Sequence, residues 1–297
     1  GDTIKYSVSS FSKEQDRSIG DVLKRMPGIE VLSDGKILYQ GRPINKYYIE
    51  GLDLLEGKYN LANENLPFKE VTQVQILENH QPIKALDSLK FSDQAALNIK
   101  LKNTYTFTGQ AHLGSGFSPL LWDANITPML FTKKKQMLAT YQANNTGDNV
   151  ASQLKKLTIE DLLNQFENNS EKTDWLSIQQ LTTPNFSEKR WLDNNIHLLS
   201  GNYLHKLKSD YELRVNASYL NDYQQQNGFT NTEFITPSNT ITILEEKQNH
   251  FFFNSLQTNI TLQKNADKNY FKNSLEFQGF WDSQRGTILL NNQQLKQ

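Results

Sequence analysis

Apolar and polar residues alternate along most of the chain after residue 102, a pattern typical of β-strands with two different faces. From Tyr105 to Leu113 the odd positions are apolar or small, whereas the even positions carry Thr, Gln or His. The same period of two returns in six later stretches, although it is blurred in the third of them. These stretches are residues 122–130, 136–143, 195–204, 211–219, 255–262 and 271–281. We therefore expect seven antiparallel strands, most of them about ten residues long.

Residues 1–102 show a different pattern, in which short alternating stretches are separated by turn residues. A serine cap and a Pro-Gly stop delimit a short helix over residues 19–26. A Ser-Asp-Gly turn at 33–35 predicts a hairpin. The expected strands are residues 3–8, 29–32, 36–39, 47–49, 71–77 and 95–101. This first part of the chain is thus predicted to be a small α+β domain that can fold alone.

The links between the seven later strands differ in length. Three are tight and contain Lys, whereas residues 145–194 and 222–249 form two long loops. The first link, residues 117–121, is short and breaks the contrast. Short turns on one side and long loops on the other predict a transmembrane β-barrel whose long loops are extracellular. The long loop at 145–194 is expected to be mobile and to act as part of a lid or docking surface.

The length of one strand supports this prediction. Tyr211 to Tyr219 is eight steps, or roughly 26 Å at about 3.3 Å per residue. Tilted by about 40°, the strand projects to roughly 20 Å, close to the apolar band between aromatic girdles. Its lipid-facing positions carry no charge, while Glu212 and Arg214 have the opposite parity. The alternative is a soluble cell-surface β-sandwich with one buried face, which would bind a glycan or protein ligand.

Composition narrows the function classes further. With 31 Lys+Arg, 32 Asp+Glu and a net charge of −1, the chain lacks the basic excess of a nucleic-acid binder. The absence of Cys excludes disulfides and thiolate metal sites. No apolar run is long enough for a spanning helix, while 31 Asn and 24 Gln suit a polar barrel lumen. No secretory leader precedes Gly1, so we expect an internal piece of a longer, processed protein.

The candidate catalytic groups do not converge in the sequence. The five His residues lack ligand-like spacing, which argues against a metal site. Asp53 and Glu56 lie beside Gly51 and Gly57, where we expect a solvated turn rather than acid–base chemistry. The sequence therefore predicts neither an enzyme nor a cofactor.

Four motifs in the first domain follow one another in a recognisable order. Leu23, Pro27 and Gly28 form a helix–Leu–x–x–x–Pro–Gly pattern, and Glu50-Gly51 ends a strand. Two further strands follow at residues 71–78 and 97–101. In this order the motifs resemble the plug domain of TonB-dependent outer-membrane receptors. The sequence departs from the family where Glu50 replaces the usual Asp, and where residues 91–96 replace a Gly-Gly pair.

The resemblance implies an architecture and a transport function. Residues 1–102 would be an α+β plug domain inside the barrel lumen, with a periplasmic N-terminus. Residues 103–297 would form the first seven to eight antiparallel transmembrane β-barrel strands of about 22. We therefore expect roughly 380 residues after Gln297 and an open sheet partly wrapped around the plug. The pattern is most similar to nutrient receptors that carry an additional carboxypeptidase-regulatory-like domain at the N-terminus.

The resemblance also implies partners. The receptor would bind a nutrient outside and import it with energy relayed by TonB and its inner-membrane complex, through a TonB box absent from this chain. Outer-membrane lipid would surround the barrel, and a surface lipoprotein would favour a glycan or peptide ligand over a siderophore. Trp175, Phe186 and Trp191 in the loop at 145–194 are expected to contact the ligand or a partner.

Overall fold

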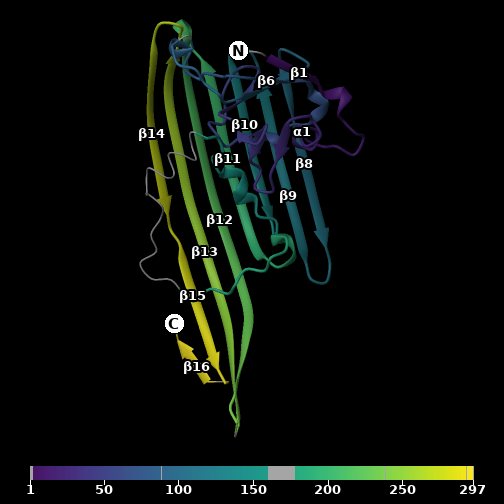
Figure 1. Cartoon of the computed structure of the whole chain (residues 1–297), viewed down its shortest axis with the longest axis vertical. Coiled ribbons are helices and arrows are strands. Elements are labelled where there is room, and N and C mark those ends of the chain that lie inside the picture. Colours follow the sequence, from purple (N-terminus) through teal and green to yellow (C-terminus); the bar gives the residue numbers. More distant parts are fainter. Residues whose placement is uncertain (1–2, 88, 160–177, 238, 292, 297) are drawn as a thin grey trace.

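One long antiparallel sheet forms a wall, and a compact N-terminal unit packs against part of it (Figure 1). This computed structural model describes residues 3–87, 89–159, 178–237, 239–291 and 293–296. We use "N-terminal unit" for residues 3–101 and "wall" for strands β8 to β16, residues 106–296. No helix in these ranges is both long enough and apolar enough to cross a membrane.

The N-terminal unit contains two small sheets. The larger has the strand order β1-β6-β7-β5, in which only β5 and β7 are parallel; the smaller has the order β2-β3-β4. The strands are β1 (Thr3–Ser7), β2 (Ile29–Val31), β3 (Ile37–Tyr39), β4 (Arg42–Pro43), β5 (Lys46–Ile49), β6 (Val71–Leu77) and β7 (Ala96–Leu101). The helices are α1 (Ile19–Leu23), α2 (Asn60–Asn63) and the 3-10 turns η1 (Val8–Ser10), η2 (Phe68–Glu70) and η3 (Lys84–Leu86). Each expected strand is present, and the expected helix is present but ends at Leu23.

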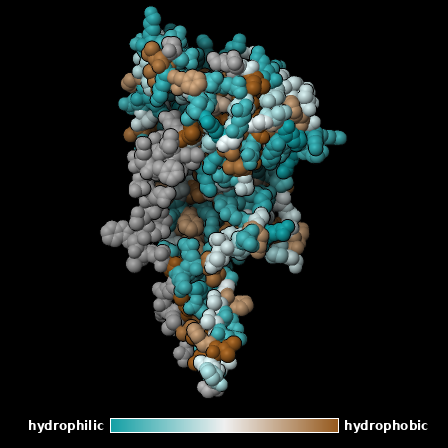
Figure 2. Space-filling model, viewed as in Figure 1, coloured by the Kyte–Doolittle hydropathy of each residue, from teal (hydrophilic) through white to brown (hydrophobic). Residues whose placement is uncertain are grey.

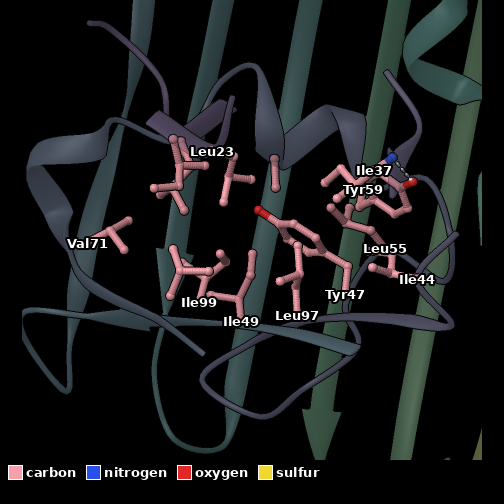
Figure 3. Packing of buried hydrophobic residues seen from close by; sticks show 14 of the residues in the cluster. Leu23, Ile37, Ile44, Tyr47, Ile49, Leu55, Tyr59, Val71, Leu97 and Ile99 are labelled. Carbon is pink, nitrogen blue, oxygen red and sulfur yellow. Dashed lines mark hydrogen bonds between the residues drawn. The ribbon is translucent and has the colours of Figure 1, made fainter. Parts of the chain in front are cut away.

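An apolar core holds this unit together and continues into the wall. Leu23, Ile49 and Leu97 are among its buried members, and Tyr47 stacks on Tyr59 with ring centroids 5.3 Å apart (Figure 3). The same cluster includes four buried residues of the wall, namely Met129, Phe131, Leu138 and Leu204. The unit is therefore attached to the wall by apolar packing as well as by polar contacts.

The wall is a nine-stranded antiparallel sheet. Its strands are β8 (Thr106–Gly116), β9 (Leu121–Phe131), β10 (Lys135–Asn144), β11 (Asp193–Lys206), β12 (Tyr211–Ile235), β13 (Thr240–Asn265), β14 (Tyr270–Phe280), β15 (Ser283–Leu290) and β16 (Gln293–Lys296). β14 and β15 pair with successive stretches of β13, so they form one interrupted strand. The wall includes all seven strands predicted from the alternation. Among the described strands, β8 and β16 each pair on one side only, so this sheet is open.

The two faces of the wall have opposite polarity. Buried polar side chains face the N-terminal unit, including Gln136, Thr140, Gln142, Asn202, Asn216 and Ser218. The outer face exposes large apolar side chains, including Phe107, Tyr141, Leu199, Tyr219, Leu275 and Phe277. The hydrophobic residues of the outer face align across strands, as in the row Tyr141–Leu199–Tyr219. Apart from the four apolar residues that join the core of the unit, the covered face of the wall is thus mainly polar, whereas its outer face is rich in exposed apolar side chains.

The predicted loop at 222–249 is wrong. Those residues continue β12 and β13 in unbroken register from Tyr211↔Lys264 to Ile235↔Thr240, and the connection is a tight turn after Ile235. This hairpin extends well beyond the N-terminal unit, and hydrophobic residues gather at its lower tip (Figures 1 and 2). The apolar residues there do not alternate regularly with polar ones over the length of a strand, so backbone pairing rather than side-chain pattern defines these strands.

The described first part of the loop at 145–194 folds inward, against the N-terminal unit. Val150, Leu157 and Thr158 are buried. Residues 157 and 159 donate backbone hydrogen bonds to Gly57 and Ile44 of the N-terminal unit, at 3.0 and 3.3 Å. Residues 145–159 therefore pack against the N-terminal unit, because their apolar side chains extend its core. The mobile lid or docking surface remains a prediction for the loop as a whole.

Two glycine turns in the smaller sheet provide a test of the packing. Gly35 and Gly41 both have a positive φ, +85° and +78°. A Cβ at Gly35 would lie 1.7 Å from Asn60 Nδ2, whereas a Cβ at Gly41 would meet nothing within 4 Å. We expect Gly41→Ala to cost about 1–2 kcal/mol of unfolding free energy from backbone strain alone, and Gly35→Ala to cost about 1–3 kcal/mol more. Urea unfolding of both variants measures the difference, and equal costs would contradict the packing of α2 on this turn.

Candidate functional site

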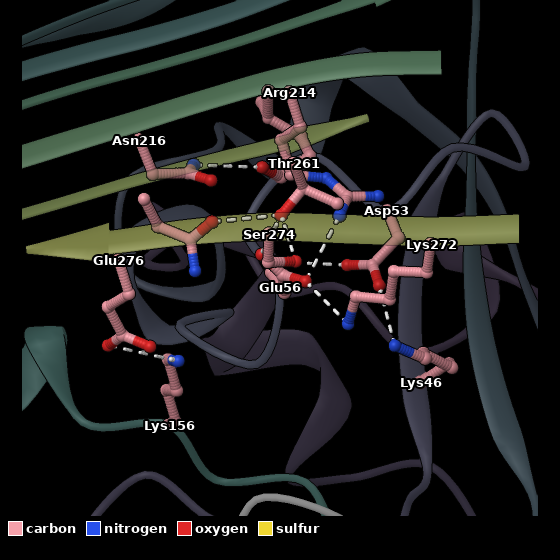
Figure 4. A network of polar contacts seen from close by, with 12 residues as sticks. Lys46, Asp53, Glu56, Lys156, Arg214, Asn216, Thr261, Lys272, Ser274 and Glu276 are labelled. Atoms are coloured by element: carbon pink, nitrogen blue, oxygen red, sulfur yellow. Dashed lines mark hydrogen bonds and ion pairs between the residues drawn. The ribbon is translucent and has the colours of Figure 1, made fainter. Parts of the chain in front are cut away.

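A cluster of charged side chains joins the N-terminal unit to the wall. The ionic cluster comprises Lys46 and the loop residues Asp53 and Glu56 from the unit, with Arg214 of β12 and Lys272 of β14 (Figure 4). Lys46 Nζ lies 2.9 Å from Asp53 Oδ2. Glu56 Oε1 lies 3.3 Å from Arg214 Nη1 and 3.0 Å from Lys272 Nζ. One carboxylate of the unit thus bridges two strands of the wall.

The charges of this cluster are sequestered from solvent. Asp53 is 8% exposed and Arg214 is 3% exposed. Burial acts to raise the pKa of Asp53, but the charges of Lys46 and Arg214 outweigh it and hold that pKa below its ordinary value. Burial is likewise outweighed at Glu56, where Arg214 and Lys272 lower the pKa. The predicted solvated turn is therefore wrong, because the wall covers Asp53 and Glu56 and supplies their counter-charges.

Amide side chains of the wall also bind the backbone of the unit. Gln136 Nε2 donates to the carbonyl of Ile49 at 2.7 Å, and Asn216 Nδ2 donates to the carbonyl of Leu54 at 3.1 Å. These donors lie on inward-facing positions of β10 and β12. Because unpaired buried amides are costly, such bonds make the N-terminal unit the polar complement of the wall.

A second feature is a polar cavity of about 600 Å³ between the unit and strands β8–β10. From the unit it is lined by α1 and its preceding residues, by the β2–β3 turn and by the end of α2. The lining side chains include Arg17, Asp21, Lys24, Asn63, Glu64, Asn65, Gln110, His112, Asp123, Asn125, Gln142, Asp148, Gln153 and Lys189. Its volume lies within the roughly 300–1,000 Å³ range of small-ligand sites.

A row of amides forms the floor of this polar cavity. Asn125 Nδ2 donates to Asn65 Oδ1 at 2.9 Å, and Asn65 Nδ2 donates to Gln153 Oε1 at 3.2 Å. Gln153 and Gln142 exchange two reciprocal amide bonds of 2.8 and 3.0 Å. The row connects the unit, the loop after β10 and the wall, so the orientation of these groups is set before any ligand arrives.

Glu64 is a carboxylic acid of the N-terminal unit whose pKa is strongly raised. Glu64 lines the polar cavity and is exposed over the residue as a whole, yet partial burial of its carboxyl and the negative charge of Asp148 raise its pKa to about 7. The positive charges of Lys24 and Lys189 lower the pKa of Glu64, but by less than burial and Asp148 raise it. Glu64 therefore changes charge near neutral pH.

The histidines and carboxylates do not assemble a metal site in the described residues. His80 Nδ1 lies 3.0 Å from Asn45 Oδ1. Burial and the charge of Lys46 lower the pKa of His80 to about 4, which keeps its ring neutral at pH 7.

The residues of the Leu–Pro–Gly and Glu–Gly motifs lie at turns and in the core of the unit. Leu23 is fully buried, Pro27 accepts a 3.0 Å bond from Tyr6 Oη, and Gly28 has a φ of +75°. Glu50 accepts from the backbone N–H of Leu101 at 2.6 Å, and Gly51 N–H donates to Asn98 at 2.9 Å. These residues therefore stabilise the unit and do not line the polar cavity.

Two of the three aromatic residues expected to contact a ligand, Phe186 and Trp191, belong to the described part of the chain. Phe186 is 52% exposed, and neither Phe186 nor Trp191 lines the polar cavity. Trp191 is half-buried beside the start of β11, and its Nε1 has no hydrogen-bond partner in the described part of the chain. Trp175 lies outside the described residues.

Comparison with known proteins returns outer-membrane receptors and transporters. No protein-family profile and no curated protein matches the chain. The alcaligin receptor FauA of Bordetella pertussis aligns over 100% of the chain at 11% identity and a TM-score of 0.31. A mutant of the ferric enterobactin receptor PfeA of Pseudomonas aeruginosa aligns over 97% at 9% identity and 0.32. The copper transporter OprC aligns over 97% at 9% identity and 0.28.

This chain spans about half the length of those structures, covering 57%, 57% and 47% of the three. The similarities are too distant to assign a family, ligand or partner. What the chain does has to be argued from its own residues.

The ionic cluster should contribute strongly to stability. Glu56→Gln leaves the guanidinium of Arg214 buried without its carboxylate, so we expect a loss of about 3–5 kcal/mol in unfolding free energy. Glu56→Leu combined with Arg214→Met should recover most of that loss. Glu276→Gln is the control, because its partner Lys156 lies 3.8 Å away in a more exposed pair and about 1 kcal/mol or less is expected. Denaturant unfolding of the complete protein in detergent measures all three.

Glu64 predicts a pH-dependent stability. Its pKa of about 7 exceeds its ordinary value of 4.5, so its stabilising contribution is complete below 4.5 and is lost as the pH rises through 7. Glu64→Gln stays neutral, so its stability relative to the natural protein should increase between about pH 5 and pH 8. Glu14→Gln, at an exposed position outside the cavity, should show no such trend. A flat difference for Glu64→Gln would mean that the carboxyl is not desolvated.

Proposed function

We propose that the chain is part of a TonB-dependent outer-membrane receptor that imports a nutrient. In this proposal residues 1–102 are the plug and residues 103–297 are the first strands of the barrel. The observation that carries it is the polarity of the wall, whose buried face is lined with Gln, Asn, Ser and Thr while its outer face exposes Tyr, Leu and Phe. A lipid-facing barrel filled by a folded domain requires this distribution.

The alternative of a soluble β-sandwich is disfavoured by the same distribution. The two inner faces of a sandwich form an apolar core, with polar residues directed outward. Here the inner face buries Gln136, Thr140 and Asn202 at 2% exposure or less, while Leu199 on the outer face is 57% exposed. In water such an outer face would aggregate, whereas hydrocarbon would bury it favourably.

The ionic cluster and the amide bonds suit a plug that must be released. Hydrogen bonds and ion pairs between the unit and the wall can be replaced by hydrogen bonds to water once solvent enters the interface. Apolar contacts of the same area have no such replacement. Energy relayed by TonB from the periplasmic end would pull on the N-terminal strand β1, which pairs only with β6 among the described strands. Displacement of the unit along β12–β14 would then open a path through the lumen.

Ligand capture is assigned to the opposite, extracellular end. The polar cavity lies on the side of the unit toward which β8 and β10 run, where the long loop at 145–194 begins. Phe186, Trp191 and Trp175 remain proposed contacts for a larger ligand or a surface lipoprotein. The outer membrane is the proposed location, with lipid around the apolar face.

Conductance measurements test the plug without knowledge of the ligand. The complete protein in a planar bilayer should conduct little, and moderate urea should open a large, reversible conductance as the N-terminal unit unfolds from the lumen. The chain has no Cys, so paired cysteines can be introduced cleanly. Asn65→Cys with Asn125→Cys, bridged by a short reducible reagent, should abolish the urea response, and a reductant should restore it. The side chains of these residues are in contact across the interface.

The matched control bridges two strands of the wall. The hydroxyls of Thr127 and Thr140 lie 2.5 Å apart on β9 and β10, so Thr127→Cys with Thr140→Cys attaches the wall only to itself. This variant should open in urea like the unbridged protein. A large conductance without urea, or an unchanged response in the bridged Asn65/Asn125 variant, would overturn the plug assignment.

A further inference from the structure

Glu64 and Arg17, which have side chains of opposite charge, both line the polar cavity. Neither the carboxyl of Glu64 nor the guanidinium of Arg17 forms a hydrogen bond or ion pair within the described part of the chain. The other charged groups of the cavity are engaged locally. Lys189 lies 3.0 Å from Asp148, His112 lies 3.4 Å from Asp123, and Lys24 lies 3.9 Å from Asp21.

These two groups are attached to rigid elements. Arg17 immediately precedes α1, and its backbone N–H donates to Asp21 at 3.1 Å. Glu64 follows α2, and its carbonyl accepts a 3.1 Å bond from Gln110 Nε2 of β8. Their backbones are therefore held at separate places on the cavity lining, while neither side chain forms a hydrogen bond or ion pair with another described residue.

The rest of the lining narrows the ligand class. Side-chain amides line the cavity, and an amide can donate to and accept from a peptide group. No Phe, Tyr or Trp occurs in the described lining, so there is no platform for stacking a sugar ring or a catechol. The lining carries four carboxylates, Asp21, Glu64, Asp123 and Asp148, against Arg17, Lys24, Lys189 and His112. It therefore has no basic excess, which disfavours a polyanion.

We propose that this cavity binds a short peptide with free termini, whose ammonium group pairs with Glu64 and whose carboxylate pairs with Arg17. The proposal rests on the proposed function, for which it names the ligand class. Charge-assisted hydrogen bonds at both ends would fix the direction of the peptide, and a guanidinium can bind a carboxylate in bidentate fashion. The amide side chains of the cavity floor would hydrogen-bond to the main chain of the peptide rather than to its side chains, so peptides of different sequence would bind.

Calorimetric titration of the complete protein in detergent tests the site directly. The probes are the tripeptide Gly-Asn-Gly, its N-acetylated form, its C-terminal amide and the neutral sugar maltotriose. We expect the free tripeptide to bind, and each blocked form to bind about tenfold or more weakly, as for the loss of one charged hydrogen bond. Maltotriose should not bind.

Two variants assign the two ends. Glu64→Gln should weaken the free tripeptide about tenfold or more but leave the affinity of the N-acetylated form unchanged. Arg17→Gln should weaken the free tripeptide while leaving the C-terminal amide unchanged. Glu14→Gln, an exposed carboxylate outside the cavity, is the control and should bind all probes like the natural protein. Because each readout is a difference between two ligands on one variant, a folding defect cannot imitate it.

Other outcomes overturn the proposal. Equal binding of free and blocked peptides, preferential binding of maltotriose, or no binding of any tripeptide would each show that the termini are not recognised here. This result can be separated from the plug assignment, because binding is measured without transport. Peptide binding without a urea-opened conductance would refute the plug assignment but support the peptide site. A urea-opened conductance without peptide binding would refute the peptide site alone.

Discussion

The structure depends on one constraint, namely that the buried face of the wall is polar and must be satisfied. Gln136 and Asn216 would be costly to bury against an apolar layer, so they bind carbonyls of the N-terminal unit at 2.7 and 3.1 Å. Arg214 imposes the same requirement more strongly, and Glu56 meets it. The buried polar groups of the wall and of the unit are thus satisfied by each other. The apolar cluster that both share fixes the position of the unit on the wall.

The same constraint explains the path of the loop after β10. Gln153 enters the amide row between Gln142 and Asn65, and Leu157 enters the apolar core. Residues 145–159 therefore join the wall to the unit and close one side of the polar cavity. A loop with fewer apolar and amide side chains would stay in solvent. The amides of Gln142 and Asn65 would then lose their partner, and the apolar core would lose Leu157. The cavity and the interface are consequently products of one set of contacts.

Much of the fold could be predicted because its signals are local. Alternation predicted seven strands of the wall, and turn residues delimited the short strands of the unit. The prediction failed from Asp222 to Asn249, where backbone pairing rather than side-chain pattern defines the strands. Little of the candidate site could be predicted, since Glu56 and Arg214 are 158 positions apart and only their pairing makes either informative. The inward parity of Arg214 was the one available signal.

The sequence by itself determined the two faces of the wall, the turns of the unit and the absence of thiol chemistry, because each follows from residue type and spacing along the chain. Only the tertiary structure decided that Asp53 and Glu56 are buried ion partners rather than solvated turn residues. It also decided that Glu64 and Arg17 share a cavity. The physical reason is that the electrostatic state of a side chain depends on its desolvation and on the charges around it, and both are supplied here by segments far apart in the chain.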